Sequence, residues 1–359
     1  MDKKRILASV VVFLILAFLV YLQYRHWRTF DWGTFWSQTH RIKKLHVLHA
    51  VALIYIAYAM RAIRWKLFLR PVRPQTKIRE LLSPTVIGFA GLALLGRAGE
   101  FIRPYLIARR TQLPFSSQLA VWAVERIFDI GAFAVLMALA IFLPSALPSI
   151  PHPEYYLRFR EAGFILIGLV VATTVAAAVI GRNGEAAAQW IEQRFAHIPS
   201  KVGASLGHKL GQKMREFGMG LNTIHGPWSL LWLTVVSVGM WYLIALSYQE
   251  VTHSYGVDAL EIPVSQLLIV VFSSMLGSML QLPAVGGGSQ ITVIATLSSV
   301  FDVPPEMAAS CGILLWLVTF AAVVPLGLLL AHRERLSLRK LSVESHHAEE
   351  EEMGHQPGV

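Results

Sequence analysis

Mixed charges interrupt one of the most apolar parts of the chain, in the stretch GRAGEFIRPYLIARR from Gly96 to Arg110. Glu100 lies three residues after Arg97 and three before Arg103, so a continuous helix would place these side chains on one face. A charge at the centre of a bilayer costs about 2.5–3.5 kcal/mol on insertion scales, and it is tolerated where charges pair or line a wet cavity. Arginine binds phosphate through two parallel hydrogen bonds, and a carboxylate can hold the arginine or an amine. The stretch therefore predicts a cavity for a polar, phosphate-bearing group.

A second charged group follows in the sequence VERIFD, near the start of the apolar segment 119–143. Glu125 and Asp129 are four residues apart on one helical face, and Arg126 is three residues before Asp129. We expect the arginine to bind phosphate, and the carboxylates to hold the arginines or an amino group of the ligand. The alternative is that these charges lie at the membrane interface and extend to lipid headgroups. Their mixed signs and their position in short breaks favour the cavity.

Three consecutive glycines, Gly286 to Gly288, follow Pro283 in a second break between apolar segments. Backbone groups freed at membrane depth must be satisfied within protein or in a cavity, and N–H groups at the start of a helix favour an anion. A simple turn between helices is the alternative explanation. The predicted headgroup cavity comprises Arg97, Glu100, Arg103, Glu125, Arg126, Asp129, Gly286, Gly287 and Gly288.

Other arginines flank apolar segments, where a long basic side chain can reach the lipid headgroups. These predicted lipid-interface residues are Arg61, Arg64, Arg109 and Arg110. No HExxH, GxSxG or CxxC pattern occurs, and the glycine run lacks the Lys-Ser/Thr of a phosphate-binding loop. We therefore expect no catalytic residues, no metal site and no cofactor. These absences favour a transporter over an enzyme.

Composition indicates a membrane protein. Of 359 residues, 55% are hydrophobic and only 15% are charged, against about 25% charged in soluble domains. The net charge is +10, and the basic residues flank apolar segments, which argues against nucleic-acid binding and favours membrane lipids as partners. The apolar segments are 6–22, 45–60, 81–96, 99–112, 119–143, 163–181, 228–247, 264–282, 289–302 and 307–331. Because several are shorter than a bilayer span, we expect an all-α polytopic protein with about eight full spans plus short or re-entrant helices.

Loop charges predict the orientation. Segment 61–79 has seven basic residues and no acidic one, and 182–227 has six against three, so both are predicted to be cytoplasmic. Segment 248–263 has no Lys or Arg and is predicted to be external, whereas the basic 23–44 loop does not fit its external assignment. The prediction is a multi-pass protein of the inner membrane with both termini in the cytoplasm.

Two stretches of the chain repeat one pattern, at about 80–143 and about 264–331. Each has a break of small residues, a short helix, a proline turn and a long helix, and the loop charges give them opposite directions. Two such units form an inverted repeat, which is typical of transporters. We therefore expect one transmembrane domain over 1–332, with an amphipathic cytoplasmic loop at 182–227 and a disordered polar tail at 333–359.

The blocks LLGRAGEFIRPYLIARR, AVWAVERIFDI and LPAVGGGSQITVIATLSSVFDVPPEMAASCGILLW resemble the lysylphosphatidylglycerol synthase transmembrane-region family, also called flippase-like integral membrane proteins. The resemblance covers about residues 5–332, and it departs from the family at Ser289 and Gln290, where relatives often carry a charge. It implies translocation of a lipid such as an anionic or aminoacylated phospholipid, a hopanoid or a glycolipid. Because the final apolar segment precedes only a polar tail, aminoacyl transfer is not expected, and a separate lipid-synthesis enzyme would be the partner.

The sequence thus predicts movement of a phospholipid, or of another lipid with a phosphate-bearing or polar headgroup, between leaflets without ATP. Two alternatives remain open. One is a membrane-embedded transferase acting on a lipid-linked substrate, and the other is a non-catalytic scaffold for lipid or glycolipid synthesis. The oligomeric state is undetermined by the sequence.

Overall fold

The structure, a computed structural model, is all helical in the part of the chain that it describes. The described residues are 31–142, 153–196, 207–212, 214–215, 227–279, 287–336 and 344. Four of the described helical segments are long and apolar enough to cross a membrane: Lys44–Leu69, Ile78–Leu95, Trp228–His253 and Pro305–Arg333. This confirms the predicted all-α polytopic membrane protein. The predicted count of eight spans stays a prediction, and the first apolar segment, 6–22, lies outside the described residues.

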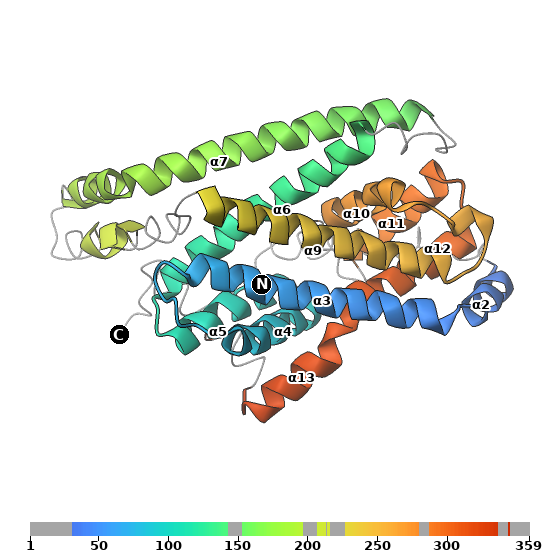
Figure 1. The fold of residues 1–359 in the computed structure, drawn as a ribbon, viewed down its shortest axis with the longest axis horizontal. Helices are drawn as coiled ribbons and strands as arrows, with labels where there is room; N and C mark the ends of the chain where they lie inside the picture. Colours follow the sequence, from blue (N-terminus) through green and yellow to red (C-terminus); the bar gives the residue numbers. More distant parts are fainter. Residues whose placement is uncertain are drawn as a thin grey trace, which may run out of the picture.

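Two long helices run side by side through the middle of the molecule (Figure 1). They are α3 (Lys44–Leu69) and α9 (Pro227–His253), and α2 (Trp32–His40) lies beyond the first residue of α3. Ala50 of α3 is fully buried, and the Ser247 hydroxyl of α9 donates to its carbonyl at 3.1 Å. Small side chains at this contact let the two backbones approach, as is common between membrane helices.

Two helical hairpins lie at opposite ends of this central pair (Figure 1). The first consists of α4 (Ile78–Leu95) and α5 (Ile102–Thr111), near the Leu69 end of α3. The second consists of α10 (Val264–Met279) and α11 (Gly287–Val300), toward the end where α2 lies. The shorter helix of each hairpin is too short to cross a bilayer, because a span needs about 20 residues.

Glycine brings the two helices of each hairpin into contact. A Cβ on Gly88 of α4 would clash with the Cα and Cβ of Arg103 on α5. In the other hairpin, a Cβ on Gly277 would clash with the backbone of Gly288 and with Thr292. The Thr292 hydroxyl also donates to a carbonyl of α10 at 2.7 Å. Both hairpins therefore depend on close backbone packing at a glycine.

The turn of the first hairpin corrects a prediction. Gly96 ends α4 with a φ of 60°, a positive value that glycine adopts without strain, and a 3₁₀ turn (η1) covers Gly96–Gly99. Arg97 lies on η1, Glu100 lies in the following turn, and Arg103 lies in the first turn of α5. The expectation that these three residues share one helical face is wrong, because the chain reverses direction between them.

A long helix follows each hairpin. After the first comes α6 (Phe115–Phe142), and after the second come α12 (Pro305–Trp316), a π-helical turn η4 (Leu317–Ala321) and α13 (Val323–Arg333). The π turn frees carbonyl groups, and the Tyr58 hydroxyl of α3 donates to one of them at 3.2 Å. In the described helices, a short helix is followed by a longer helical stretch in both units, and residues 280–286 of the second expected break lie outside the described residues.

Glu334, directly after α13, joins that helix to the first hairpin. The Ser83 hydroxyl of α4 donates to its carboxylate, and Arg110 of α5 forms an ion pair with it. Above this contact α13 packs on α4 closely enough that a Cβ on Gly327 would clash with Ala90. These contacts fix α5 at one end of the molecule.

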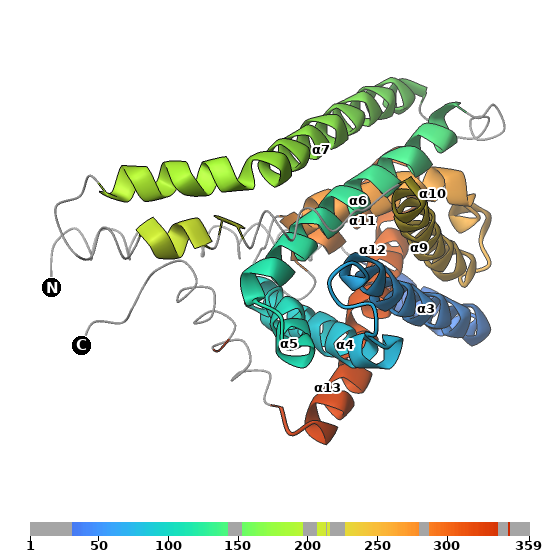
Figure 2. The same cartoon turned by 60° about the vertical axis from the view of Figure 1, so that its left-hand side comes forward.

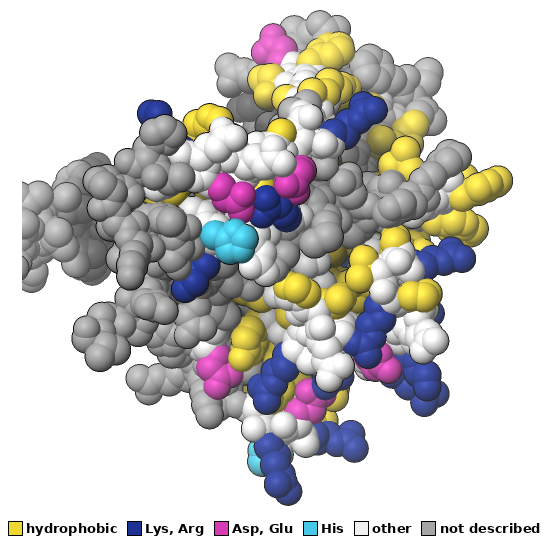
Figure 3. All heavy atoms as spheres, turned by 90° about the vertical axis from the view of Figure 1, so that its left-hand side faces the viewer, with side chains coloured by type: hydrophobic (Ala, Val, Ile, Leu, Met, Phe, Trp, Pro, Cys, Tyr) yellow, Lys and Arg dark blue, Asp and Glu magenta, His cyan; other side chains and the backbone are white. Residues whose placement is uncertain are grey.

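Lys and Arg side chains gather on the lower part of this end of the molecule (Figure 3). The exposed basic residues of α4, α5 and the segments beside them are Arg70, Lys77, Arg79, Arg109, Arg333 and Arg335. They include members of the basic 61–79 segment, the segment that the sequence predicts to be cytoplasmic.

The longest of the described helices, α7 (Pro153–Ala196), lies along the outside of the molecule and contacts α6 (Figures 1 and 2). It continues past a non-helical residue, Asn183, into the segment predicted to be an amphipathic loop. There, Arg215 forms ion pairs with Glu185 and Glu192 at 2.8 Å, and its hydrogen bonds hold the pKa of both carboxyl groups below the usual value. The link is therefore present at neutral pH and is lost as the pH falls through those lowered pKa values.

Gly277→Ala tests the close packing of the second hairpin. The added methyl group has no space between α10 and α11, and we expect a loss of about 1–3 kcal/mol in the free energy of unfolding. Gly168→Ala on α7 is the matched control, since a Cβ there meets nothing within 4 Å. The control should be neutral or gain up to about 1 kcal/mol from helix propensity. Thermal unfolding in detergent measures both, and equal stability of the two variants would contradict the packing.

Candidate functional site

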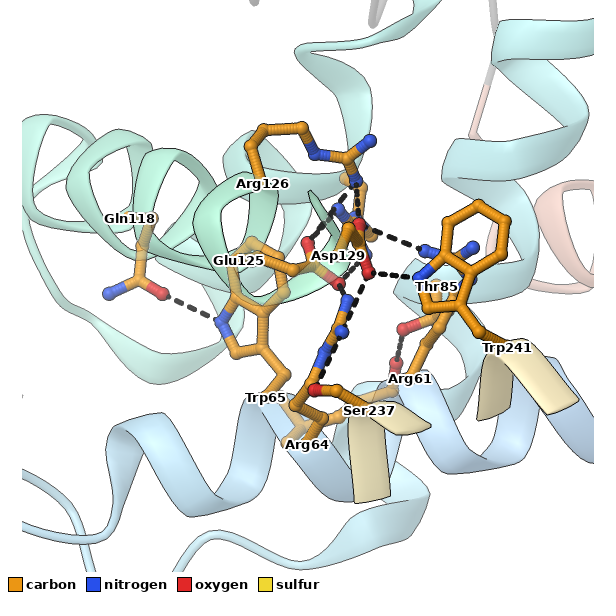
Figure 4. Close-up of polar contacts among 12 residues, drawn as sticks. Arg61, Arg64, Trp65, Thr85, Gln118, Glu125, Arg126, Asp129, Ser237 and Trp241 are labelled. Atoms are coloured by element: carbon orange, nitrogen blue, oxygen red, sulfur yellow. Dashed lines mark hydrogen bonds and ion pairs between the residues drawn. The ribbon is translucent and has the colours of Figure 1, made fainter. Parts of the chain in front are cut away.

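Six charged side chains from three helices meet beside α9 (Figure 4). We call them the arginine cluster: Arg61 and Arg64 from α3, Arg103 from α5, and Glu125, Arg126 and Asp129 from α6. Five of the six are buried residues. The helical spacing of three residues in α3 and of four in α6 places the members on facing sides of these helices.

Arg64 is the centre of the cluster. Its side chain is 0% exposed, and it donates to Glu125 at 2.6 Å and to Asp129 at 2.7 Å. The same nitrogen that reaches Asp129 also donates to the Ser237 hydroxyl of α9 at 3.0 Å. One guanidinium thereby joins α3, α6 and α9. Such charge-assisted hydrogen bonds are the strong ones, because both partners are ionised.

Arg103 is the second arginine that binds Glu125. Its two terminal nitrogens donate to the two carboxylate oxygens, one of them at 3.0 Å. Its guanidinium also lies over the ring of Trp65, 4.6 Å from the centroid, and over Phe89 at 5.2 Å. This combination of a bidentate ion pair and aromatic stacking is specific to arginine. Pro104 causes no break, because the first turn of a helix needs no backbone donor at that position.

The two carboxylate oxygens of Asp129 differ in their hydrogen bonds. Oδ1 accepts from Arg64 and from the indole N–H of Trp241 at 3.1 Å. Oδ2 lies 3.2 Å from Arg126 and 3.7 Å from Arg61, and it completes no hydrogen bond with the described groups. Nη1 of Arg61, which faces it, completes none either.

The two remaining arginines differ in exposure. The Arg126 side chain is 44% exposed and lies over the Trp122 ring at 5.8 Å. Arg61 is buried, with its guanidinium 4.9 Å from the centroid of the Phe89 ring. In Figure 4, Arg126 extends from the side of α6 that faces away from α3. One arginine can therefore meet a ligand from outside, and the other lies deeper beside it.

Four guanidinium groups face two carboxylates in this cluster, which leaves an excess of two positive charges. A buried charge without a partner is expensive in a protein interior, and more so within a bilayer. The site is therefore chemically suited to an anion with several acceptor oxygens. Phosphate fits the donors, because guanidinium binds it through two parallel hydrogen bonds.

The family described as "lysylphosphatidylglycerol synthase TM region" matches residues 6–327. The chain belongs to this family. This confirms the resemblance noted from the sequence blocks and, with the apolar helices, a multi-pass membrane protein.

Two curated proteins are similar to this family member. A "UPF0104 membrane protein" of Methanothermobacter thermautotrophicus is 21% identical over 287 residues, which are 79% of this chain and 83% of that protein. A "Glycosyltransferase AglD" of Haloferax volcanii is 33% identical over 94 residues, 26% of this chain, and the match spans only 15% of that protein. No solved structure matches the chain.

The structure brings together four of the residues predicted for the headgroup cavity, Arg103, Glu125, Arg126 and Asp129. Glu100 lies half-buried in the hairpin turn and forms no ion pair with the described side chains. The side chain of Arg97 and all of Gly286 lie outside the described part. Gly287 and Gly288 lie at the start of α11, and Gly288 is packed against α10 in the other hairpin.

The four predicted lipid-interface residues fall into two groups that differ in burial. The assignment is wrong for Arg61 and Arg64, because both are buried among carboxylates and aromatic rings rather than facing headgroups. Their spacing of three residues, which places them on one face of α3, is the signal that could have revealed this. Arg109 is exposed and Arg110 pairs with Glu334, so contact with lipids stays a prediction for these two. Sequence reasoning also missed Ser237 and Trp241, whose partners are distant in sequence.

Glu125→Gln tests whether the family member's fold depends on this cluster. The change removes the charge that Arg64 and Arg103 share, and breaking such a buried pair costs about 3–5 kcal/mol. Glu250→Gln is the matched control, because its partner His46 is partly exposed and exposed ion pairs contribute about 0–1 kcal/mol. Thermal unfolding in detergent compares the two. Equal losses in both variants would show that Glu125 has no special structural role.

Proposed function

We propose that the chain moves a lipid with a phosphate-bearing headgroup between the two leaflets, with the arginine cluster as the headgroup site. The observation that carries this proposal is the excess of two arginines over carboxylates at a buried position crossed by α3, α5, α6 and α9. Membership in the lysylphosphatidylglycerol synthase TM-region family supports a lipid-related function.

The positions of Arg126 and Arg61 support entry of a headgroup from the side. A lipid keeps its acyl chains in the bilayer while its phosphate meets Arg126, whose side chain is half-exposed on α6. Arg61 lies beyond Asp129 from there, deeper in the protein. Fixed arginines replace the water that a phosphate loses on leaving the membrane surface, which lowers the barrier to crossing.

The two hairpins support a transporter with inverted units, about 80–143 and 264–331. Each pairs a longer helix with a short one through a buried glycine, and they lie at opposite ends of the α3–α9 pair (Figure 1). Rocking of one unit against the other would open the headgroup site to one leaflet at a time. The proposed location is the inner membrane, with both termini in the cytoplasm, and the basic end in Figure 3 supports that orientation.

The contacts narrow the choice of a proton-carrying group, if movement is coupled to protons. Protonation of Glu125 would leave Arg64 and Arg103 without their shared partner. Glu100 in the hairpin turn holds no arginine among the described residues, so it is the carboxylate suited to that role. Movement down the lipid's own gradient requires no such group.

A transferase acting on a lipid-linked substrate is the second candidate. It is favoured by the 94-residue similarity to a protein named as a glycosyltransferase. The headgroup site would then hold the lipid phosphate of an acceptor. A requirement for a metal ion or an activated donor in the purified protein would favour this candidate over translocation.

Reconstitution in liposomes with headgroup-labelled lipids tests the proposed function. A quencher outside the vesicles should reach inner-leaflet label faster with the protein than without it, for at least one phosphate-bearing lipid. Arg126→Gln should slow this rate at least about tenfold, because one lost bidentate contact of about 1.5–3 kcal/mol corresponds to that factor or more. Arg79→Gln, an exposed change at the start of α4, should leave it unchanged. Protein-free rates across a panel of lipids would refute translocation.

A further inference from the structure

We propose that the headgroup site selects a doubly charged phosphate, a lipid phosphate monoester or diphosphate, held between Arg61 and Arg126 beside Asp129. This inference rests on the proposed function for the location of the site. It goes further in naming the charge and the ester class of the headgroup, which separates monoester and diphosphate lipids from the phosphodiester lipids that make up most bilayers.

Two of the four arginines are already engaged with the protein's carboxylates. Arg103 uses both terminal nitrogens on Glu125. Arg64 uses one nitrogen on Glu125 and the other on Asp129 Oδ1 and Ser237. These contacts are at most 3.0 Å long and are buried. A ligand would have to break strong hydrogen bonds to reach either side chain.

Arg61 and Arg126 are held much more weakly. Their contacts with the protein's carboxylates are ion pairs of 3.2 Å or longer, and both meet at the same oxygen, Asp129 Oδ2. Nη1 of Arg61 and Oδ2 of Asp129 complete no hydrogen bond with described groups, although both atoms are buried. Because both nitrogens lie within 3.7 Å of one oxygen, both can contact a single phosphate group.

The charges then decide between phosphate classes. The two carboxylates balance Arg64 and Arg103, so Arg61 and Arg126 supply the two positive charges in excess. A dianionic phosphate balances both of them. A phosphodiester leaves one uncompensated, and a zwitterionic headgroup brings its own cation into a positive site. Uncompensated charge is unfavourable at the buried Arg61, so the dianion is preferred.

No other charged group is described at this part of the site. The elements packed around Arg61 and Arg126 contribute Arg64 from α3, Arg103 from α5, and the two carboxylates of α6. From α9 come Ser237 and Trp241, and from α4 comes Phe89, all uncharged. The pH response that we expect therefore originates in the ligand, because a phosphate monoester loses its second proton at a pKa of about 6.

The test measures binding to the purified full chain in an uncharged detergent. The probes are dodecyl phosphate, its methyl diester of the same chain length, and inorganic phosphate. Raising the pH from 5 to 7 increases the dianionic fraction of dodecyl phosphate from about one tenth to about nine tenths. We expect its affinity to rise about tenfold over that range. The diester should bind at least tenfold more weakly at pH 8, with no such pH dependence.

Three variants connect this preference to the proposed residues. Arg126→Gln should weaken dodecyl phosphate binding at least tenfold at pH 8 and remove most of the preference over the diester. Arg61→Gln should do the same where the variant folds. Arg126 is half-exposed, so its replacement should disturb the fold less than that of Arg61. If Arg61→Gln unfolds, the binding measurement therefore relies on Arg126→Gln. The control Arg79→Gln should bind like the natural chain.

The outcomes separate this inference from the proposed function. Equal affinity for monoester and diester, or an affinity independent of pH, would overturn the dianion preference even if lipid translocation is observed. Inorganic phosphate competing as well as dodecyl phosphate would overturn a lipid source for the phosphate. Conversely, pH-dependent binding of dodecyl phosphate that is lost in Arg126→Gln would support the inference even if no lipid crosses the bilayer in liposomes.

Discussion

The buried guanidinium of Arg64 is the constraint on which the rest of the structure depends. It reaches Glu125 and Asp129 on α6 and Ser237 on α9, so it fixes the mutual rotation of three helices. Hydrophobic contacts alone would not fix this rotation. Lipid chains are as apolar as the helix surfaces, so no hydrophobic driving force brings membrane helices together. A buried charge that needs partners on two other helices supplies the missing specificity.

In both hairpins a glycine allows close backbone contact, but the contact positions different side chains. Glycines allow close contact in both, at Gly88 in the first and at Gly277 in the second. In the first, the contact carries Arg103 directly to Glu125. In the second, it carries hydroxyl groups such as Thr292, and the side chains described there are uncharged. Among the described residues, the buried charge thus lies on one side of the molecule, next to the hairpin that positions Arg103.

Basic residues do two physically different things in this protein. Those on the end shown in Figure 3 remain exposed at the surface, where a charge costs little free energy. Three of the four arginines of the cluster are buried, where each needs a carboxylate, an aromatic face or a ligand, and Arg126 is half-exposed beside them. Neighbours in sequence can belong to different groups: Arg64 is completely buried, whereas Arg70 is exposed.

The sequence by itself determined the membrane class, the helical architecture, the two broken segments and the mixed charges of Glu125, Arg126 and Asp129. These follow from local quantities, namely apolar run length, glycine and proline positions, and helical spacing. Only the tertiary structure decided that Arg61 and Arg64 join the cluster and that Glu100 does not pair with Arg103. Glu125 lies 61 residues from Arg64. The turn between η1 and α5 separates Arg97, Glu100 and Arg103, which a continuous helix would align. Sequence spacing specifies neighbours within one helix, whereas partners on different helices are selected by how those helices pack.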